Sequence, residues 1–161
     1  MQIKKWAGLA SVVLITSTLL SAGTSAQAVN KNPVRIISLS PSATEILFGI
    51  GAGSQVIAVD DNSDFPSTAP FTKLSSFTPN VEAIAAYHPD LVVLQSSATS
   101  ANAIASSLAK LKISVFLEVT PSNIAEAYAE YLALGKVTGH PSRAKALVAT
   151  KIGRASCRER V

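Results

Sequence analysis

The side chains that could carry out catalysis are few, and their spacing does not suit it. The chain has two histidines, His88 and His140, each beside a proline, and neither has an obvious carboxylate partner that would orient its ring. None of the serines lies in a Gly-x-Ser-x-Gly segment, the sharp turn that exposes the nucleophile in one large class of hydrolases. A Ser-His-Asp triad needs all three groups in mutual contact. We therefore predict no catalytic residue.

Metal and cofactor sites are not predicted either. Asp60, Asp61 and Asp64 offer oxygen ligands for calcium, but the twelve-residue loop that ends in a glutamate is absent. We interpret these residues as a solvated, turn-forming cluster. The glycines of residues 49–53 are spaced like part of a dinucleotide-binding loop, yet they follow a predicted helix and precede a predicted strand, the reverse of that motif's order. We predict that they end the helix.

The elements that must position the polar side chains alternate along the chain. Short apolar runs have the length of buried strands, and each is followed by apolar residues at helical spacing. The predicted strands are 36–39, 55–59, 91–95 and 114–119, and the predicted helices lie around 41–49, 80–88, 104–111 and 124–139, with a final one from about 142. We interpret residues 65–77, rich in Pro, Ser and Thr, as a loop. This order predicts an α/β fold, a parallel sheet with helices on both faces.

Two helix ends are left open by the sequence. Pro41 suits a first helical position, whereas Ser42 with Glu45 three residues later has the spacing of a capping box. The helix that begins near residue 124 ends at either Gly135 or Gly139.

The carboxyl ends of the predicted strands are the expected place for a ligand, because ligands bind there in open parallel sheets. The segments that leave those ends are 40–42, 61–63, 95–97 and 119–121, and they are rich in hydroxyl and amide groups, which favours binding over catalysis. Phe77 is either a stacking face for a ligand or a core aromatic. The predicted ligand-binding residues are Ser40, Pro41, Ser42, Asn62, Phe77, Gln95 and Ser96.

The two ends differ in composition from the rest. Residues 1–28 combine lysines, an apolar run and an Ala-x-Ala motif, typical of a secretory signal peptide, so we expect a mature form without a membrane anchor. Residues 152–161 carry three arginines and no apolar period, and we expect a non-native tail; the alternative is a natural basic tail. These two segments contain five of the 14 Lys and Arg residues and one of the 10 Asp and Glu residues, so the rest of the chain has nine basic and nine acidic residues. The basic pI therefore does not indicate nucleic-acid binding.

Four blocks carry a resemblance to a known family: RIISLSPSATEILFGIG, VIAVDDNSDFP, NVEAIAAYHPDLVVL and LGKVTGHPSRAKALV. In their order and spacing, residues 34–151 resemble the periplasmic substrate-binding proteins of ABC importers for cobalamin, haem and iron-siderophores, the class III family with a helical backbone. The resemblance implies two α/β lobes joined by a long helix, with ligand in the cleft between them. It implies that residues 29–141 form the N-terminal lobe, that 142–151 begin the inter-lobe helix, and that the second lobe is missing.

The resemblance also implies a role for Glu82. By itself, a carboxylate in the first turn of a helix is explained by its favourable interaction with the helix dipole. In the family, a glutamate of an Asn-Val-Glu or Asn-Leu-Glu motif docks into an arginine pocket of the membrane permease, which implies that Glu82 contacts the permease. Aromatic residues that grip cobalamin in some members are matched near Phe77, while Asn62 and Gln95 stand where others have aromatics.

These observations lead to one main hypothesis about function. We expect an exported, periplasmic or extracytoplasmic solute-binding component of an ABC importer for a metal chelate, which captures small-molecule cargo without catalysis, needs no cofactor and delivers the cargo to a permease. Nucleic acid is not an expected partner. The alternatives are a sensor or adhesin module built on the same lobe and an enzyme on a doubly wound α/β sheet.

Overall fold

The computed structural model of the protein describes residues 32–158, and the side chains through residue 153. The predicted signal peptide, residues 1–28, therefore lies outside the described residues. The described part forms one α/β unit.

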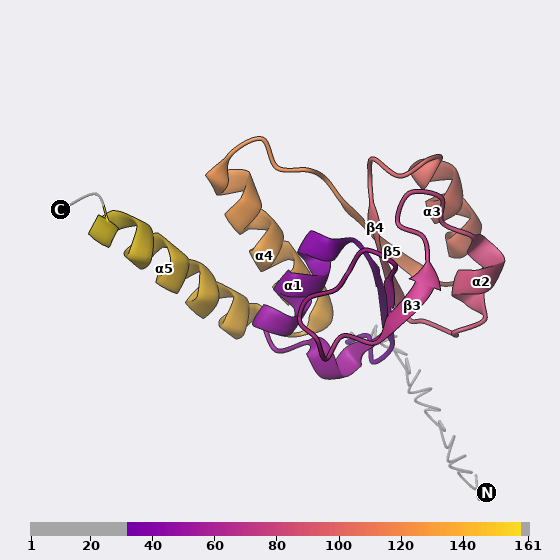
Figure 1. Ribbon diagram of the computed structural model, residues 1–161, viewed down its shortest axis with the longest axis horizontal. Helices are drawn as coiled ribbons and strands as arrows, with labels where there is room; N and C mark the ends of the chain where they lie inside the picture. Colours follow the sequence, from indigo (N-terminus) through magenta and orange to yellow (C-terminus); the bar gives the residue numbers. More distant parts are fainter. Residues whose placement is uncertain (1–31, 159–161) are drawn as a thin grey trace, which may run out of the picture. The chain divides into compact units, whose positions relative to one another are not determined.

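A single five-stranded sheet lies at the centre of this unit (Figure 1). The strands are β1 (Ile36–Leu39), β2 (Val56–Asp60), β3 (Phe71–Leu74), β4 (Leu91–Gln95) and β5 (Ser114–Glu118). Their spatial order is β3-β2-β1-β4-β5, and every neighbouring pair is parallel. This confirms the predicted parallel sheet. Strand β1 is at its centre, so its four residues are all buried.

Helices cover both faces of the sheet, as predicted. The helices are α1 (Pro41–Gly49), α2 (Val81–Ala85), α3 (Ala101–Lys110), α4 (Ile124–Thr138) and α5 (Pro141–Arg158), with a 3₁₀ turn, η1, at Gly53–Gln55. On one face, α1 and α4 pack on the sheet and α5 packs on α4. On the other face lie α2 and α3. Successive strand residues face opposite layers, which explains why the strands have uninterrupted apolar sequences.

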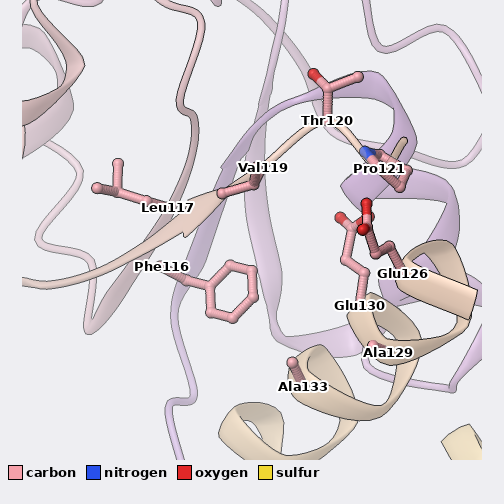
Figure 2. A pocket seen from close by; sticks show the side chains of 9 residues that line it. All are labelled: Phe116, Leu117, Val119, Thr120, Pro121, Glu126, Ala129, Glu130 and Ala133. Carbon is pink, nitrogen blue, oxygen red and sulfur yellow. The ribbon is translucent and has the colours of Figure 1, made fainter. Parts of the chain in front are cut away.

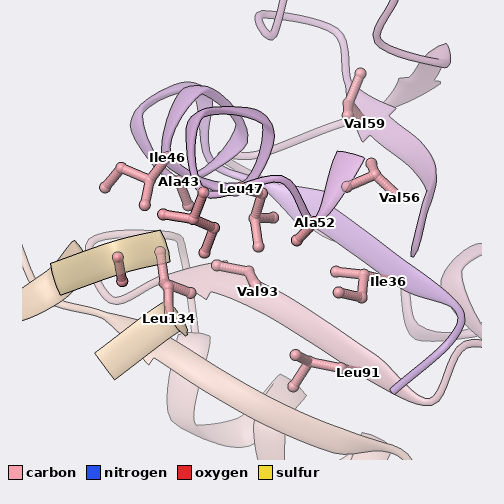
Figure 3. Close-up of a cluster of buried hydrophobic side chains, with 12 residues drawn as sticks. Ile36, Ala43, Ile46, Leu47, Ala52, Val56, Val59, Leu91, Val93 and Leu134 are labelled. Atoms are coloured by element: carbon pink, nitrogen blue, oxygen red, sulfur yellow. The ribbon is translucent and has the colours of Figure 1, made fainter. Parts of the chain in front are cut away.

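The core cluster on the α1 and α4 face shows how the layers are held together (Figure 3). Leu47 of α1 and Leu134 of α4 are both fully buried, and both contribute to the cluster that contains Ile36 and Val93 of the sheet. Burying a side chain of this size contributes roughly 1.5–3 kcal/mol. This packing of helices on the sheet holds the strands, and therefore their ends, in fixed positions.

One prediction about the elements was wrong, since part of the expected loop at 65–77 is the edge strand β3. It pairs with β2 through Val59 and Phe71 and through Asp60 and Leu74. Of the four residues of β3, only Leu74 is buried, so the strand lacks the apolar run that identifies the inner strands. The pairing with β2 supplies the stability that its own sequence does not indicate.

The structure settles both open helix ends. Ser40 caps α1 by accepting a hydrogen bond from the Ala43 amide at 3.3 Å, so Pro41 is the first helical residue, and the alternative start with Ser42 as the cap is not adopted. Helix α4 ends at Gly139, whose φ of 82° is the left-handed conformation that glycine adopts without strain. Gly135 lies inside α4.

The glycines of residues 49–53 follow α1, and Gly51 has a φ of 84°, in keeping with helix termination. The last helix, α5, begins at Pro141 and continues through the expected non-native tail as far as Arg158. Ala144 and Val148 are buried, as the helical spacing predicts.

Candidate functional site

Because all five strands are parallel, their carboxyl ends lie along one edge of the sheet, here called the carboxyl edge. The sheet order places the segment after β1 in the middle, with the segments after β2 and β3 on one side and those after β4 and β5 on the other. The polar segments predicted from the sequence are thus brought together by the topology.

The segment after β1 is held by a chain of hydroxyl groups. Ser40 is fully buried, and its Oγ lies 3.0 Å from the Oγ of the exposed Ser42. The hydroxyl of Thr44, one turn into α1, donates to Ser38 at 2.9 Å. Pro41, which follows Ser40 in the chain, is half-buried. Of the three predicted binding residues here, Ser42 presents its side chain toward the carboxyl edge, while Ser40 holds the turn in place.

The segment after β2 corrects one expectation. Asp60 is not solvated: it is the last residue of β2, is fully buried, and accepts a hydrogen bond from the hydroxyl of Ser63. Asp61 and the predicted binding residue Asn62 are exposed. The Asn62 side-chain amide donates to Ser76 at 3.2 Å, which ties the segment after β2 to the one after β3.

Phe77 is on the segment after β3 and joins it to the other half of the carboxyl edge. Its carbonyl accepts a hydrogen bond from the Thr99 amide at 2.9 Å, which links the segment after β3 to the segment after β4. Its side chain is 63% exposed, so Phe77 is not a core aromatic. An aromatic ring of this exposure offers a stacking face to a ligand.

The segment after β4 contains the two remaining predicted residues. Gln95 is the half-buried last residue of β4 and pairs in register with Glu118 of β5. Ser96 is exposed, and its amide donates to the Glu118 carbonyl at 2.8 Å. Their side chains are placed at the same edge as Ser42.

Two residues that the sequence analysis did not select, Glu118 and Glu130, form a pair of carboxyl groups beside this edge. Glu118 ends β5, is 3% exposed, and accepts a hydrogen bond from the Ser42 hydroxyl. Burial, together with the nearby charge of Glu118, raises the pKa of the Glu130 carboxyl from 4.5 to about 8. The sequence did contain an indication for Glu118, because a charged residue at the end of a largely apolar strand is unusual. It contained no indication for Glu130, because glutamates on a helix of this composition usually face the solvent.

Glu82 lies apart from this pair, in the first turn of α2. Asn80 caps the helix by accepting the Ala83 amide at 2.8 Å, and Glu82 itself is exposed. Within the described part of the chain, its carboxylate has neither an ion pair nor a hydrogen bond. It is therefore available to an external partner.

Residues 32–158 contain no group of three or more His, Cys, Asp or Glu side chains arranged to hold a metal ion. Within the same range, every helix is too short or too polar to cross a membrane.

Comparison with known proteins places the chain among binding proteins. A family model described as periplasmic binding protein matches residues 36–151. An uncharacterised ABC transporter substrate-binding lipoprotein of Bacillus subtilis is 32% identical over 74% of this chain and 39% of its own length. The vitamin B12-binding protein of Yersinia pseudotuberculosis is 32% identical over 84% of this chain and 46% of its own length.

A solved structure extends the comparison to the fold. A protein of Staphylococcus epidermidis, described as a possible iron-binding (periplasmic solute-binding) protein, superposes with a TM-score of 0.67 at 30% identity, covering 74% of this chain and 48% of that one. The chain thus spans somewhat less than half the length of the relatives that it matches.

Proposed function

The chain belongs to the periplasmic binding protein family, and we propose that it is the ligand-capturing lobe of an exported solute-binding protein that serves an ABC importer. Its cargo is a metal chelate of the iron-siderophore, haem or cobalamin class, and it acts in the periplasm or an equivalent extracytoplasmic space. It captures the cargo without catalysis and delivers it to a membrane permease. The relatives named for vitamin B12 and for iron support this choice of cargo class.

The observation that carries this proposal is the composition of the carboxyl edge. Ser42, Asn62 and Ser96 are exposed polar residues on the segments that follow β1, β2 and β4, and Phe77, whose ring is exposed, is on the segment that follows β3 and is joined by its carbonyl to the segment after β4. Hydroxyl and amide groups around an exposed aromatic ring can bind a large, polar, ring-containing cargo by hydrogen bonds and stacking.

The cargo site is shared between two lobes in this proposal. The relatives are about twice as long as the matched region, so a second lobe would supply the opposite wall of the cleft. Residues 142–151, within α5, would begin the helix that joins the lobes. One wall leaves much of the cargo in water, so this lobe alone binds weakly.

Delivery depends on Glu82. An unpaired, exposed carboxylate can form a charge-assisted hydrogen bond with an arginine of the permease, and such contacts govern the orientation and rate of docking. Glu82 is in the first turn of α2 and is not one of the residues assigned to the cargo, so a substitution there changes docking without removing a cargo contact.

The experiment that tests this proposal uses Glu82→Ala in the full-length gene product. We expect cargo affinity by calorimetry to stay within twofold and uptake of labelled cargo into cells to fall at least tenfold, since docking alone is lost. Glu45→Ala, which removes an exposed carboxylate from α1 instead, is the matched control and should leave uptake unchanged. Normal uptake with Glu82→Ala would exclude the docking role.

A further inference from the structure

A cavity of about 310 Å³ lies between the end of β5 and the N-terminal half of α4 (Figure 2). The ring of Phe116 points from β5 toward α4. Most of the lining is apolar and comes from β5, from α4 and from the segment that joins them: Phe116, Leu117, Val119, Pro121, Ala129 and Ala133. None of the described residues that line the cavity is basic. Transfer of an apolar group from water to this cavity is therefore favourable.

Two glutamates also line the cavity, but they leave its inner wall uncharged at neutral pH. Glu126 is exposed, and its carboxylate accepts hydrogen bonds from the Ser122 amide at 2.7 Å and hydroxyl at 2.8 Å and from the Asn123 side chain at 2.9 Å. Glu130 shares a proton with Glu118, which is buried and does not line the cavity. Burial and the charge of Glu118 raise the pKa of Glu130 to about 8, so the Glu130 carboxyl is neutral at pH 7.

Two exposed apolar side chains lie on the chain between β5 and α4. Val119, which lines the cavity, is 69% exposed, and Ile124, the first residue of α4, is 70% exposed. These are the two most exposed large apolar side chains among the described residues. Exposed apolar surface next to an apolar cavity is a mark of a ligand-binding groove.

The cavity adjoins the proposed cargo site. Val119 and Thr120 follow β5 directly, so this end of the cavity is at the carboxyl edge. Glu118, the last residue of β5, accepts a hydrogen bond from the Ser42 hydroxyl, and its carbonyl accepts one from the Ser96 amide at 2.8 Å. Two residues assigned to the cargo are therefore bonded to the strand end at which the cavity begins.

We propose that this cavity binds an uncharged apolar substituent of the cargo, an alkyl or aryl group, while Ser42 and Ser96 contact the polar part of the same cargo. An apolar cavity of about 150 Å³ accommodates benzene, so this one has room for a group at least as large as a phenyl ring. The assignment rests on the proposed function and narrows the cargo to chelates that carry an apolar group beside a polar face. The segment after β5, for which the sequence predicted no binding residue, supplies the apolar part of the site.

The proton on Glu130 makes this binding depend on pH. The charged groups around it are Glu118 on β5 and Glu126 on its own helix, whereas Glu45 of α1 and Lys151 of α5 line a different pocket. As pH rises through about 8, Glu130 ionises, and an ionised carboxylate holds water that an apolar group must displace. The affinity for a neutral apolar group should therefore fall above this pH.

The test uses cyclohexanol as the probe and myo-inositol as its matched ligand, since both are neutral six-membered rings and only inositol is covered with hydroxyl groups. Ligand-observed NMR titrations of the full chain at pH 6 should give a Kd in the millimolar range for cyclohexanol and binding at least tenfold weaker for inositol. Between pH 6 and pH 9 the cyclohexanol affinity should fall roughly tenfold, because about a tenth of Glu130 keeps its proton at pH 9. Glu130→Gln should remove this pH dependence, because glutamine cannot ionise.

Variants locate the site and connect it to the cargo. Ala129 and Ala125 are both exposed and one turn apart on α4, but only Ala129 lines the cavity. Ala129→Phe fills part of the cavity and should weaken cyclohexanol binding at least tenfold, while Ala125→Phe, which adds the same ring elsewhere on the helix, should not. In the full-length gene product, titrated with cyanocobalamin, haemin and a ferric siderophore, Ala129→Phe should likewise weaken the chelate that binds by at least tenfold. Circular dichroism checks that each variant is folded, and the pH series on the unmodified chain remains decisive if one is not.

Three results would overturn the proposal. They are equal binding of cyclohexanol and inositol, a cyclohexanol affinity that is the same at pH 6 and pH 9, and equal effects of Ala129→Phe and Ala125→Phe on the bound chelate. Self-association of the chain that is abolished by Ala129→Phe alone would show that a second copy covers the cavity, and would also overturn it. Each failure would leave the importer function standing, because Glu82-dependent uptake tests that function separately. If no chelate binds, the proposed function fails, while cyclohexanol still tests the cavity.

Discussion

The pairing of the Glu130 carboxyl with the buried Glu118 should make the stability of the protein depend on pH, and Glu130→Gln tests this. In the folded protein the pKa of Glu130 is about 8, against 4.5 for an unperturbed glutamate. The folded state therefore binds more protons than the unfolded state between these values, and stability falls as pH rises from about 4.5 to about 8. Glutamine keeps the shape, cannot ionise and can donate a hydrogen bond to Glu118, so the variant should not show this loss.

The magnitude follows from the shift and from the exposure of Glu130. A shift of this size would be worth roughly 5 kcal/mol for a fully enclosed group, at about 1.4 kcal/mol per pKa unit. Glu130 is only half-buried, and solvent screens the interaction, so we expect about 2 kcal/mol at pH 9. The variant should thus be more stable than the unmodified chain at pH 9 by about 2 kcal/mol and equal to it near pH 4.

Urea unfolding followed by circular dichroism at pH 4, 6, 7.5 and 9 measures this difference. Glu45→Gln, which also removes one negative charge but at an exposed position of α1, controls for the general effect of charge and should show no such trend. If the free energy of unfolding of Glu130→Gln differs from that of the unmodified chain by the same amount at every pH, the shared-proton pair is refuted.

Three further predictions concern packing and the division of the site. Leu134→Ala, in the core shared by α1, α4 and the sheet, should lower the free energy of unfolding by about 2–5 kcal/mol in urea, while the partly exposed Leu132→Ala should cost below about 1 kcal/mol; equal losses would contradict the packing. Gly139→Ala should cost at least about 1 kcal/mol by the same assay, since φ is 82° and the new Cβ would lie 2.2 Å from Asn32; an unchanged midpoint would contradict this. Residues 29–151 alone should bind no metal chelate with micromolar affinity by calorimetry, whereas the full-length gene product should; tight binding by one lobe would contradict a shared cleft.

The sequence was sufficient to predict the parts of the fold that depend on local pattern. The runs at 36–39 and 91–95 are apolar because the sheet buries them on both faces, and that pattern identifies them without further information. Ala144 and Val148 follow helical spacing and are buried as expected. The edge strand β3 was missed because only Leu74 of its residues is buried, so its existence depends on pairing with β2.

The candidate site was predictable in its location and less so in its members. Parallel strands bring their carboxyl ends to one edge, so Ser42, Asn62 and Ser96 could be placed there from order alone. Which side chains are free could not be predicted, because this depends on tertiary contacts. Ser40 faces inward and caps a helix, and Glu130 meets Glu118 only because α4 packs beside β5.

The most direct test of the central claim is cargo binding by Phe77→Ala in the full-length gene product, titrated with cyanocobalamin, haemin and a ferric siderophore. Phe65→Ala is the matched control, because both rings are 63% exposed and Phe65 lines a pocket with Lys151 that does not include Phe77. We predict that one chelate class binds with micromolar affinity or better, that Phe77→Ala weakens it at least tenfold, and that Phe65→Ala does not. Absence of binding by every chelate, or equal affinities of the two variants, would contradict the account.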